Sequence, residues 1–263
     1  MISVNGIEIT PTIFPDGTSQ VWKIDENIFK DRTAFIRWDF ENESEIFHLM
    51  QLVDLLRTGR EARINLNMPY LPYGRQDKRI SNNTTFALTT FARILDSLNL
   101  SNIITTDMHS EELKYLVNCE VRDEPAFKYY TDAFEKCGAD IMAYPDDGAF
   151  KRYKSGFNPI IGHKNRDQET GYILGYKIEG NPEGKKILMV DDICDGGMTF
   201  RLMARELYKQ GAEEVHLYVT HGIFSRGLEV LHADGIQRIF TMDGEVTEPY
   251  EKGEDSPLLT QGV

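Results

Sequence analysis

Short apolar segments alternate with longer segments of helical period along most of this 263-residue chain. Apolar residues recur at helical spacing in residues 44–57 and 84–98, which predicts amphipathic helices, and Ser44 is placed to cap the first of them. Residues 102–107 and 187–192 instead read as strands. Repeated strand–helix–strand units of this length predict parallel sheets with helices on both faces.

The alternation is interrupted near residue 122, where charged and turn-forming residues gather in the stretch CEVRDEP. We therefore expect an α/β protein with two domains, residues 1–122 and residues 123–263, each a mostly parallel sheet flanked by helices. Ligands of such sheets bind at the carboxyl ends of strands. The polar clusters described next all follow predicted strands.

The charge balance limits the class of partner. The chain has 42 acidic and 29 basic side chains, a formal net charge of −13, which disfavours binding to nucleic acid through its phosphates. A small polyanion can still bind where basic groups converge and a divalent cation neutralises the rest. No apolar run approaches the roughly 18 residues of a membrane helix, and the N-terminus has no signal-peptide pattern. Three widely spaced cysteines suit a reducing compartment, so we expect a cytoplasmic protein.

The stretch KKILMVDDICDGGMTF, residues 185–200, joins an apolar strand to a predicted helix. Asp191 and Asp192 emerge at the carboxyl end of the strand. The turn that follows consists of Asp195, Gly196, Gly197, Met198 and Thr199. Backbone N–H groups at a helix start bind anions, glycines allow close approach, and carboxylates accept hydrogen bonds from hydroxyls. Ribose 5-phosphate meets these requirements together. The alternative is a plain strand–turn–helix with acids favoured by the helix dipole.

Two clusters in the first half have similar placement. Arg75 and Gln76, in PYGRQDKR, supply fork-like donors that suit phosphate or an adenine edge, although a basic surface loop would look the same. Asp107 and His109 follow the next strand at alternate positions and are expected to share a face. That pair suits a hard metal ion or a phosphate, whereas a lone histidine is usually structural.

The fourth cluster contains Lys164 and Arg166, which follow a predicted strand and open a polar, glycine-bearing segment. A free loop at this position could close over a ligand, neutralise phosphates in a transition state and exclude water. A solvated hairpin is the alternative.

Together these motifs resemble the ribose-phosphate diphosphokinase (PRPP synthetase) family, over roughly residues 14–225. The family has a PRPP-binding loop with the pattern of VDDICDGGMT. Its PYxRQDK, xDLH and SPDxGxxKR motifs are similar to PYGRQDKR, TDMH and YPDDGAFKR in this chain, and its Lys-x-Arg to Lys164 and Arg166. VTHGIFSRG likewise resembles the family's THGxFSG motif.

The resemblance implies two phosphoribosyltransferase-like domains and an enzyme that uses Mg²⁺. The enzyme would transfer the β,γ-diphosphoryl group of ATP to the 1-hydroxyl of ribose 5-phosphate, giving 5-phosphoribosyl 1-diphosphate (PRPP) and AMP. The implied site residues are Phe14, Asp16, Arg75, Gln76 and His109 for ATP; Asp107, His109 and Asp146 for Mg²⁺; Arg166, Asp191, Asp192, Asp195, Gly196, Gly197, Met198 and Thr199 for ribose 5-phosphate; and Lys164 with Arg166 for catalysis.

Phe14 and Asp16 lie in IFPDGTSQVW, which is similar to a family element that reaches into a neighbouring subunit's adenine pocket. We therefore expect at least a dimer that shares its active site. Thr18 stands where the family has an acidic residue, and Met198 stands where it usually has a small one. A positive φ at Met198 would strain the loop. Only thirteen residues precede Phe14 and the C-terminal end is short, so we expect a shortened member.

Two alternative functions stay open. A phosphoribosyltransferase that consumes PRPP would share the PRPP loop, but would have no reason to keep PYGRQDKR and TDMH in a separate first domain. A non-catalytic regulatory relative of the synthetase would be expected to lose the Lys-x-Arg segment, which this chain keeps as HKNR.

Overall fold

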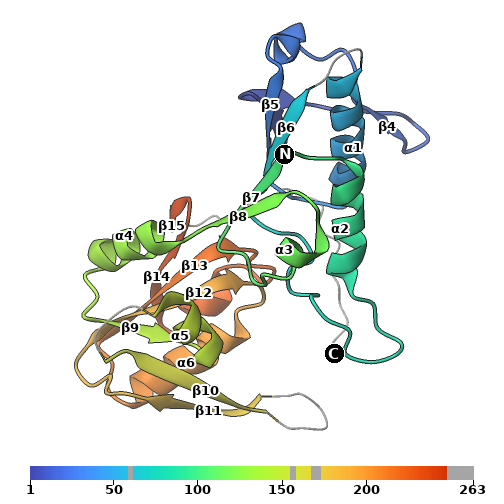
Figure 1. The fold of residues 1–263 in the computed structure, drawn as a ribbon. Helices are drawn as coiled ribbons and strands as arrows, with labels where there is room; N and C mark the ends of the chain where they lie inside the picture. The colour runs from blue at the N-terminus through green and yellow to red at the C-terminus, as the bar shows by residue number, and fades with distance from the viewer. Residues whose placement is uncertain (59–61, 155–157, 167–172, 248–263) are drawn as a thin grey trace. The chain divides into compact units, whose positions relative to one another are not determined.

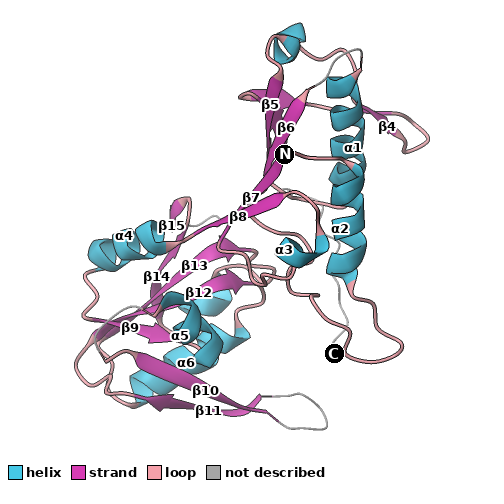
Figure 2. Ribbon diagram, in the orientation of Figure 1, coloured by secondary structure: helices cyan, strands magenta, loops and turns pink. Residues whose placement is uncertain are grey.

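A computed structural model of the chain describes residues 1–58, 62–154, 158–166 and 173–247 (Figure 1). The chain divides into two compact units, Met1–Pro125 and Ala126–Val263. Helices and strands alternate in both units, as the repeated strand–helix pattern predicts (Figure 2). Within the described ranges, no helix combines the length and the apolar character that crossing a membrane requires.

Unit 1 is built on a six-stranded sheet with the order β2-β1-β5-β6-β7-β8. Its strands are β1 Ile2–Val4, β2 Ile7–Ile9, β5 Thr33–Trp38, β6 Arg63–Asn67, β7 Asn102–Thr106 and β8 Glu120–Glu124. Strands β5 to β8 run parallel, whereas β1 pairs antiparallel with both β2 and β5. A separate small hairpin joins β3 Thr12–Ile13 to β4 Ser19–Gln20.

The helices of unit 1 are α1 Ser44–Arg57, α2 Ala87–Ser97, the short α3 Leu113–Leu116 and the 3₁₀ turn η1 Glu26–Phe29. Helix α1 has the bounds that its apolar spacing predicts. The predicted cap is wrong, however, because Ser44 is the first helical residue and its hydroxyl donates to Oδ1 of Asn42. Asn42 also accepts from the backbone N–H of Ser44 at 3.1 Å.

A single core cluster lies between α1, α2 and one face of the unit 1 sheet. On β5, Ala34, Ile36 and Trp38 are buried in this core, while the alternate residues Phe35 and Arg37 are exposed. Both long helices follow the same side of the sheet in Figure 1. Helices on both faces are therefore a wrong prediction for unit 1, because alternate positions of its strands are polar or exposed.

Unit 2 is built on a seven-stranded sheet with the order β11-β10-β9-β12-β13-β14-β15. Its strands are β9 Ile141–Tyr144, β10 Ile160–Arg166, β11 Ile173–Glu179, β12 Lys186–Cys194, β13 Glu214–Gly222, β14 Ile236–Thr241 and β15 Gly244–Val246. The five central strands run parallel, and the two edge strands β11 and β15 are antiparallel.

Helices cover both faces of the unit 2 sheet. They are α4 Phe127–Cys137, α5 Asp147–Tyr153, α6 Met198–Lys209 and the short α7 Glu229–His232. On β12, Ile187 and Met189 belong to the core beneath α6, while Leu188 and Val190 belong to the core beneath α4. Burial on both sides explains why β12 reads as an unbroken apolar run, and it confirms the two-sided arrangement here.

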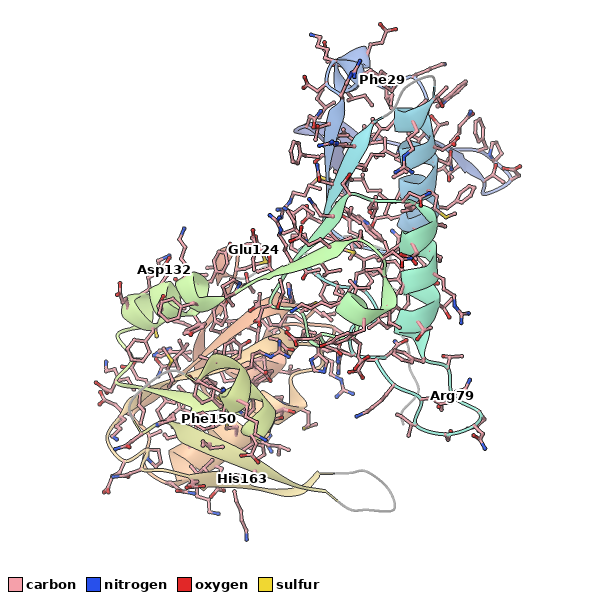
Figure 3. The ribbon with its side chains drawn as sticks, viewed as in Figure 1. Phe29, Arg79, Glu124, Asp132, Phe150 and His163 are labelled. Atoms are coloured by element: carbon pink, nitrogen blue, oxygen red, sulfur yellow. The ribbon has the colours of Figure 1, made fainter. Side chains whose placement is uncertain are left out.

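The stretch CEVRDEP, expected to interrupt the fold, contains strand β8, which ends at Glu124 (Figure 3). The strand lies at the edge of the unit 1 sheet, and its residues alternate between exposed and half-buried. Its many charged side chains are compatible with such an edge position. This composition explains why the segment does not look like a strand in the sequence.

Candidate active site

The turn from β12 into α6 contains the residues of unit 2 that the sequence suggests for anion binding. Strand β12 continues to Cys194, so Asp191 and Asp192 lie within the strand rather than beyond it. Gly197 adopts φ +73° before the first helical residue, and a Cβ on this glycine would lie 2.7 Å from Cδ2 of Leu231. Both the backbone conformation and the lack of space therefore require glycine at this position.

Met198 begins helix α6 and lies outside the left-handed region, so the anticipated strain does not arise. Its side chain is 47% exposed. Because the N-cap residue is Gly197, no side chain caps the helix, and the first N–H groups of α6 remain suited to an anion. Met198 and Thr199, expected in the turn, lie in the first turn of the helix.

The acidic residues of this segment differ in their surroundings. Asp192 is buried, and its Oδ2 lies 3.5 Å from a guanidinium nitrogen of Arg152 on α5. Asp191 is half-buried, and its Oδ1 accepts a hydrogen bond from the N–H of Asp192 at 3.0 Å. Asp195, in the turn, accepts from the hydroxyl of Ser225 at 2.6 Å. Arg152 belongs to the motif YPDDGAFKR, but sequence reasoning did not assign it to the site.

Asp146 caps helix α5, where its carboxylate accepts a hydrogen bond from the N–H of Ala149 at 3.0 Å. The hydroxyl of Tyr176, on β11, donates a hydrogen bond to the carbonyl of Pro145, the residue before Asp146. Burial, and then the charges of Asp146 and Asp191, raise the pKa of Tyr176 well above its ordinary value. Asp146 follows β9 and Asp191 lies within the adjacent strand β12, and the charges of both carboxylates act on the half-buried Tyr176.

Tyr176 was missed in the sequence, which offers no motif around it. It packs across Gly162 of β10, where an added Cβ would lie 2.2 Å from the tyrosine hydroxyl. Only a glycine on β10 leaves room for this ring to reach Pro145.

Lys164 and Arg166 lie at the end of β10 rather than after it, paired in register with Tyr176 and Ile173 of β11. The register shifts between Asn165 and Arg166. Their side chains, and residues 167–172 that follow them, are outside the described part of the chain. The predicted closing loop thus stays a prediction.

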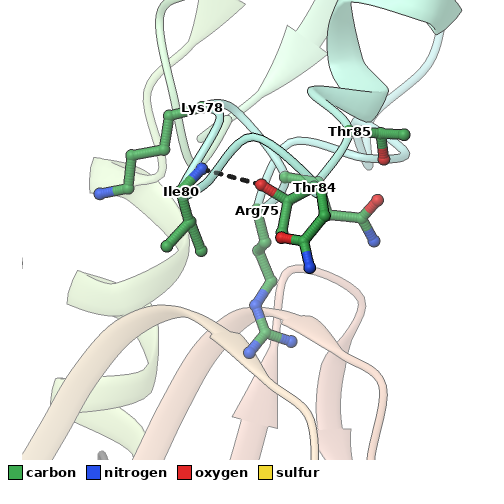
Figure 4. Close-up of a pocket in the computed structure, with 7 residues that line it drawn as sticks. Arg75, Lys78, Ile80, Thr84 and Thr85 are labelled. Carbon is green, nitrogen blue, oxygen red and sulfur yellow. Dashed lines mark hydrogen bonds between the residues drawn. The ribbon is translucent and has the colours of Figure 1, made fainter. Parts of the chain in front are cut away.

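In unit 1, Arg75 and Gln76 line an open pocket of about 420 Å³ in the connection between β6 and α2 (Figure 4). The remaining lining residues are Lys78, Ile80, Asn83, Thr84 and Thr85. The N–H of Ile80 donates to Oγ1 of Thr84 at 3.1 Å and closes this loop on itself. A guanidinium, an amide and an ammonium group on one pocket suit a phosphate chain or an adenine edge.

Asp107 and His109 do not share a face, so that prediction is wrong. Strand β7 ends at Thr106, and Asp107 takes a left-handed conformation, φ +51°, which breaks the alternation of the strand. Asp107 is buried, whereas His109 is exposed. The pKa of the neighbouring Asp123 is raised, first by burial and further by the charge of Asp107.

The metal residues expected from the sequence fall in both units, with Asp107 and His109 in unit 1 and Asp146 in unit 2. Among the residues that the structure describes, no three His, Cys, Asp or Glu side chains gather as a metal site. Mg²⁺ is commonly held by one or two carboxylates together with substrate phosphates. Asp146 and Asp191, whose charges both act on Tyr176, supply the carboxylates that such binding needs, so the residues fit this ion.

Phe14 and Asp16 lie at the tip of the β3–β4 hairpin. The ring of Phe14 lies 6.2 Å from that of Trp22. Asp16 is exposed, and it accepts hydrogen bonds from the N–H of Thr18 at 3.0 Å and from its hydroxyl at 2.7 Å. These bonds lower the pKa of Asp16. Thr18 thus shapes the tip of the hairpin.

Comparison with known proteins assigns each unit to a family domain. The N-terminal domain of ribose phosphate pyrophosphokinase matches residues 2–98, and the phosphoribosyl transferase domain matches residues 109–250. The ribose-phosphate pyrophosphokinase of Cereibacter sphaeroides is 30% identical over 68% of this chain and 56% of its own length. A relative from Lactococcus lactis is 25% identical over 77% of this chain and 65% of its own length. The chain thus spans less than two thirds of either relative.

The crystal structure of phosphoribosylpyrophosphate synthetase from Mycobacterium smegmatis has the same fold. It matches with a TM-score of 0.75 and 22% identity, covering 89% of this chain and 79% of that chain. Two PRPP-synthetase-type domains follow one another in the expected order along the sequence, each with a mostly parallel sheet flanked by helices. The chain therefore belongs to the ribose-phosphate pyrophosphokinase family.

Proposed function

We propose that this protein is a ribose-phosphate diphosphokinase, which transfers the β,γ-diphosphoryl group of ATP to ribose 5-phosphate and releases AMP and PRPP. The observation that carries the proposal is the β12–α6 turn. Asp191 and Asp192 lie near the end of β12, and helix α6 begins shortly after it, directly behind Gly197. No side chain caps the first N–H groups of this helix. A sugar phosphate presents hydroxyls that suit the carboxylates and a dianion that suits the N–H groups.

In this proposal the sugar binds to unit 2. Asp191 and Asp192 accept hydrogen bonds from its 2- and 3-hydroxyls, directly or through a cation. The N–H groups of residues 195–199 hold the 5-phosphate. The ion pair with Arg152 offsets the cost of burying the carboxylate of Asp192.

The nucleotide binds to unit 1, where Arg75 and Gln76 contact ATP. His109 would help to hold the Mg²⁺ that accompanies the nucleotide. Phe14 stacks on the adenine and Asp16 accepts from its amino group, in both cases in a neighbouring subunit. The functional unit is accordingly at least a dimer. Cys119, Cys137 and Cys194 form no disulfide, as expected in a reducing compartment, which supports a cytoplasmic location.

The chemical step needs no covalent intermediate on the protein. The 1-hydroxyl oxygen of the sugar forms a bond to the β-phosphorus as the bond to the AMP oxygen breaks, and the hydroxyl gives up its proton. Lys164 and Arg166 neutralise charge on the transferring group, and the fixed ends of β9 and β12 orient the sugar. Asp146 with Asp191 in unit 2, and Asp107 with His109 in unit 1, are the residues that would hold Mg²⁺, which would supply further charge neutralisation.

The test is phosphorus NMR of the protein with ATP, ribose 5-phosphate and Mg²⁺. We expect PRPP and AMP to appear together in equal amounts. Omission of ribose 5-phosphate and the Asp191→Asn variant serve as controls, since each removes one part of the proposed site. Formation of ADP, or of no product, contradicts the proposal. Binding of PRPP without its formation would instead favour a transferase that consumes it.

A further inference from the structure

The loop after β13 folds back onto the turn that follows β12. The N–H groups of Ile223 and Phe224 both donate to the carbonyl of Cys194, at 2.8 and 3.1 Å. The hydroxyl of Ser225 donates to the carboxylate of Asp195 at 2.6 Å. Three hydrogen bonds thus hold this loop beside the residues proposed to bind the 5-phosphate.

Arg226, the next residue of the loop, lies against the backbone of that turn. A Cβ on Gly196 would be 3.6 Å from Nε and 3.7 Å from Cδ of Arg226, which is ordinary packing distance. The arginine side chain therefore runs along the glycine at the middle of the turn. Arg226 itself is exposed.

The guanidinium of Arg226 is not engaged by any carboxylate of the described part of this unit. Among the described residues, none forms an ion pair or side-chain hydrogen bond with its guanidinium. The guanidinium also lies near the N-terminus of α6, where the helix dipole disfavours a cation. The guanidinium and the first N–H groups of α6 both gain a favourable interaction once an anion occupies the space beside them.

The surrounding side chains point to a doubly charged anion. Asp191, Asp192 and Asp195 make the segment acidic, and Arg152 already pairs with Asp192. Binding a phosphate dianion here needs a further positive charge. Arginine suits this task because its planar fork can donate two parallel hydrogen bonds to one phosphate group.

We propose that Arg226 binds the 5-phosphate of ribose 5-phosphate together with the N–H groups of the β12–α6 turn. This assignment rests on the proposed function of that turn as the sugar-phosphate site. It makes Arg226 a determinant of affinity for the phosphorylated sugar, with little part in the transfer itself.

The experiment compares the whole protein with its Arg226→Gln and Arg226→Lys variants, by calorimetric titration with ribose 5-phosphate and with ATP in the presence of Mg²⁺. We expect Arg226→Gln to weaken ribose 5-phosphate binding at least tenfold and ATP binding less than twofold. Arg226→Lys should recover part of the loss, because it restores charge without the fork. Lys209→Gln, an exposed change at the far end of α6, is the matched control and should leave both affinities unchanged.

The assignment is overturned if Arg226→Gln binds ribose 5-phosphate as tightly as the unaltered protein, or loses affinity for both ligands in equal proportion. A fall in turnover with ribose 5-phosphate affinity intact overturns it as well. Failure of the proposed reaction gives a different result. In that case the unaltered protein binds ribose 5-phosphate and forms no PRPP, while the Arg226 effect on affinity persists.

Discussion

The two units bury their sheets in different ways. Unit 1 has one core cluster, between helices α1 and α2 and a single face of its sheet. Unit 2 has two clusters, one on each face. The strands differ accordingly. Buried and exposed residues alternate along β5, whereas Ile187 to Val190 on β12 are all buried.

This difference also applies to the candidate residues of each unit. The β12–α6 turn of unit 2 follows a strand that is packed on both sides, and Gly197 lies where there is no space for a Cβ. The pocket of unit 1 is formed by a surface loop, and its residue Ile80 is 82% exposed. The turn of unit 2 is therefore fixed by packing, whereas the loop of unit 1 is open to solvent.

The largest expected effect comes from truncating each core. Leu66→Ala and Met189→Ala each remove a fully buried side chain, and we expect each to cost about 2–5 kcal/mol of folding free energy. Because the cores are separate, hydrogen exchange should accelerate mainly in β6 for the first variant and in β12 for the second. Equal acceleration in both units for either variant would mean that the two units unfold as one.

Next in size is Lys164→Ala, which tests whether catalysis belongs to unit 2. We expect turnover to fall at least a hundredfold, about 2.7 kcal/mol of activation free energy, with both substrate affinities little changed. Lys177→Ala, on the neighbouring strand β11, is the control and should keep turnover within about a factor of two. A Lys164 variant that retains most of its turnover removes this residue from the catalytic role.

A smaller effect is expected for Arg75→Ala in the unit 1 pocket. ATP affinity should fall about tenfold, equivalent to about 1.4 kcal/mol, because one charged donor is lost. Affinity for ribose 5-phosphate should not change. Arg79→Ala, in the same loop but not lining the pocket, is the matched control and should have little effect. Equilibrium titration measures the ATP affinity of both variants. If the two variants bind ATP equally weakly, the loop attracts ATP by charge alone.

Tyr176→Phe should cost about 1 kcal/mol, since it removes the hydrogen bond to Pro145 and keeps the ring over Gly162. Chemical denaturation monitored by the fluorescence of the chain would measure this loss. A variant as stable as the unaltered protein would show that the ring alone holds the end of β9 in place.

The smallest expected effect is a pH dependence in unit 2. Hydrogen bonds from Arg205 and Arg201 outweigh the opposing effect of burial and hold the pKa of Asp234 below its ordinary value. Its stabilising contribution is therefore complete above the unfolded pKa, about 3.8–3.9, and is lost as the pH falls through the lower folded value. Thermal melts of Asp234→Asn should be less acid-sensitive than those of the unaltered protein. Identical melting profiles from pH 6 to about pH 3 would contradict this.

Some features could be predicted because the information is local. Helix α1 follows from apolar residues three and four apart, and the β12–α6 turn is contained in one continuous stretch. The face shared by Asp107 and His109 was predicted wrongly, because a left-handed residue at the strand end changes the direction of the side chains. Periodicity describes regular backbone and fails at its ends.

The sequence by itself determined the α/β class, the order of the two domains and the glycine-bearing turn between β12 and α6, because each depends on residues close together in the chain. Only the tertiary structure decided which faces are covered and which distant side chains complete the site. Arg152, Tyr176 and Arg226 reach that site from three other elements. Their roles depend on the packing of parallel strands, which brings chain segments together irrespective of their separation in sequence.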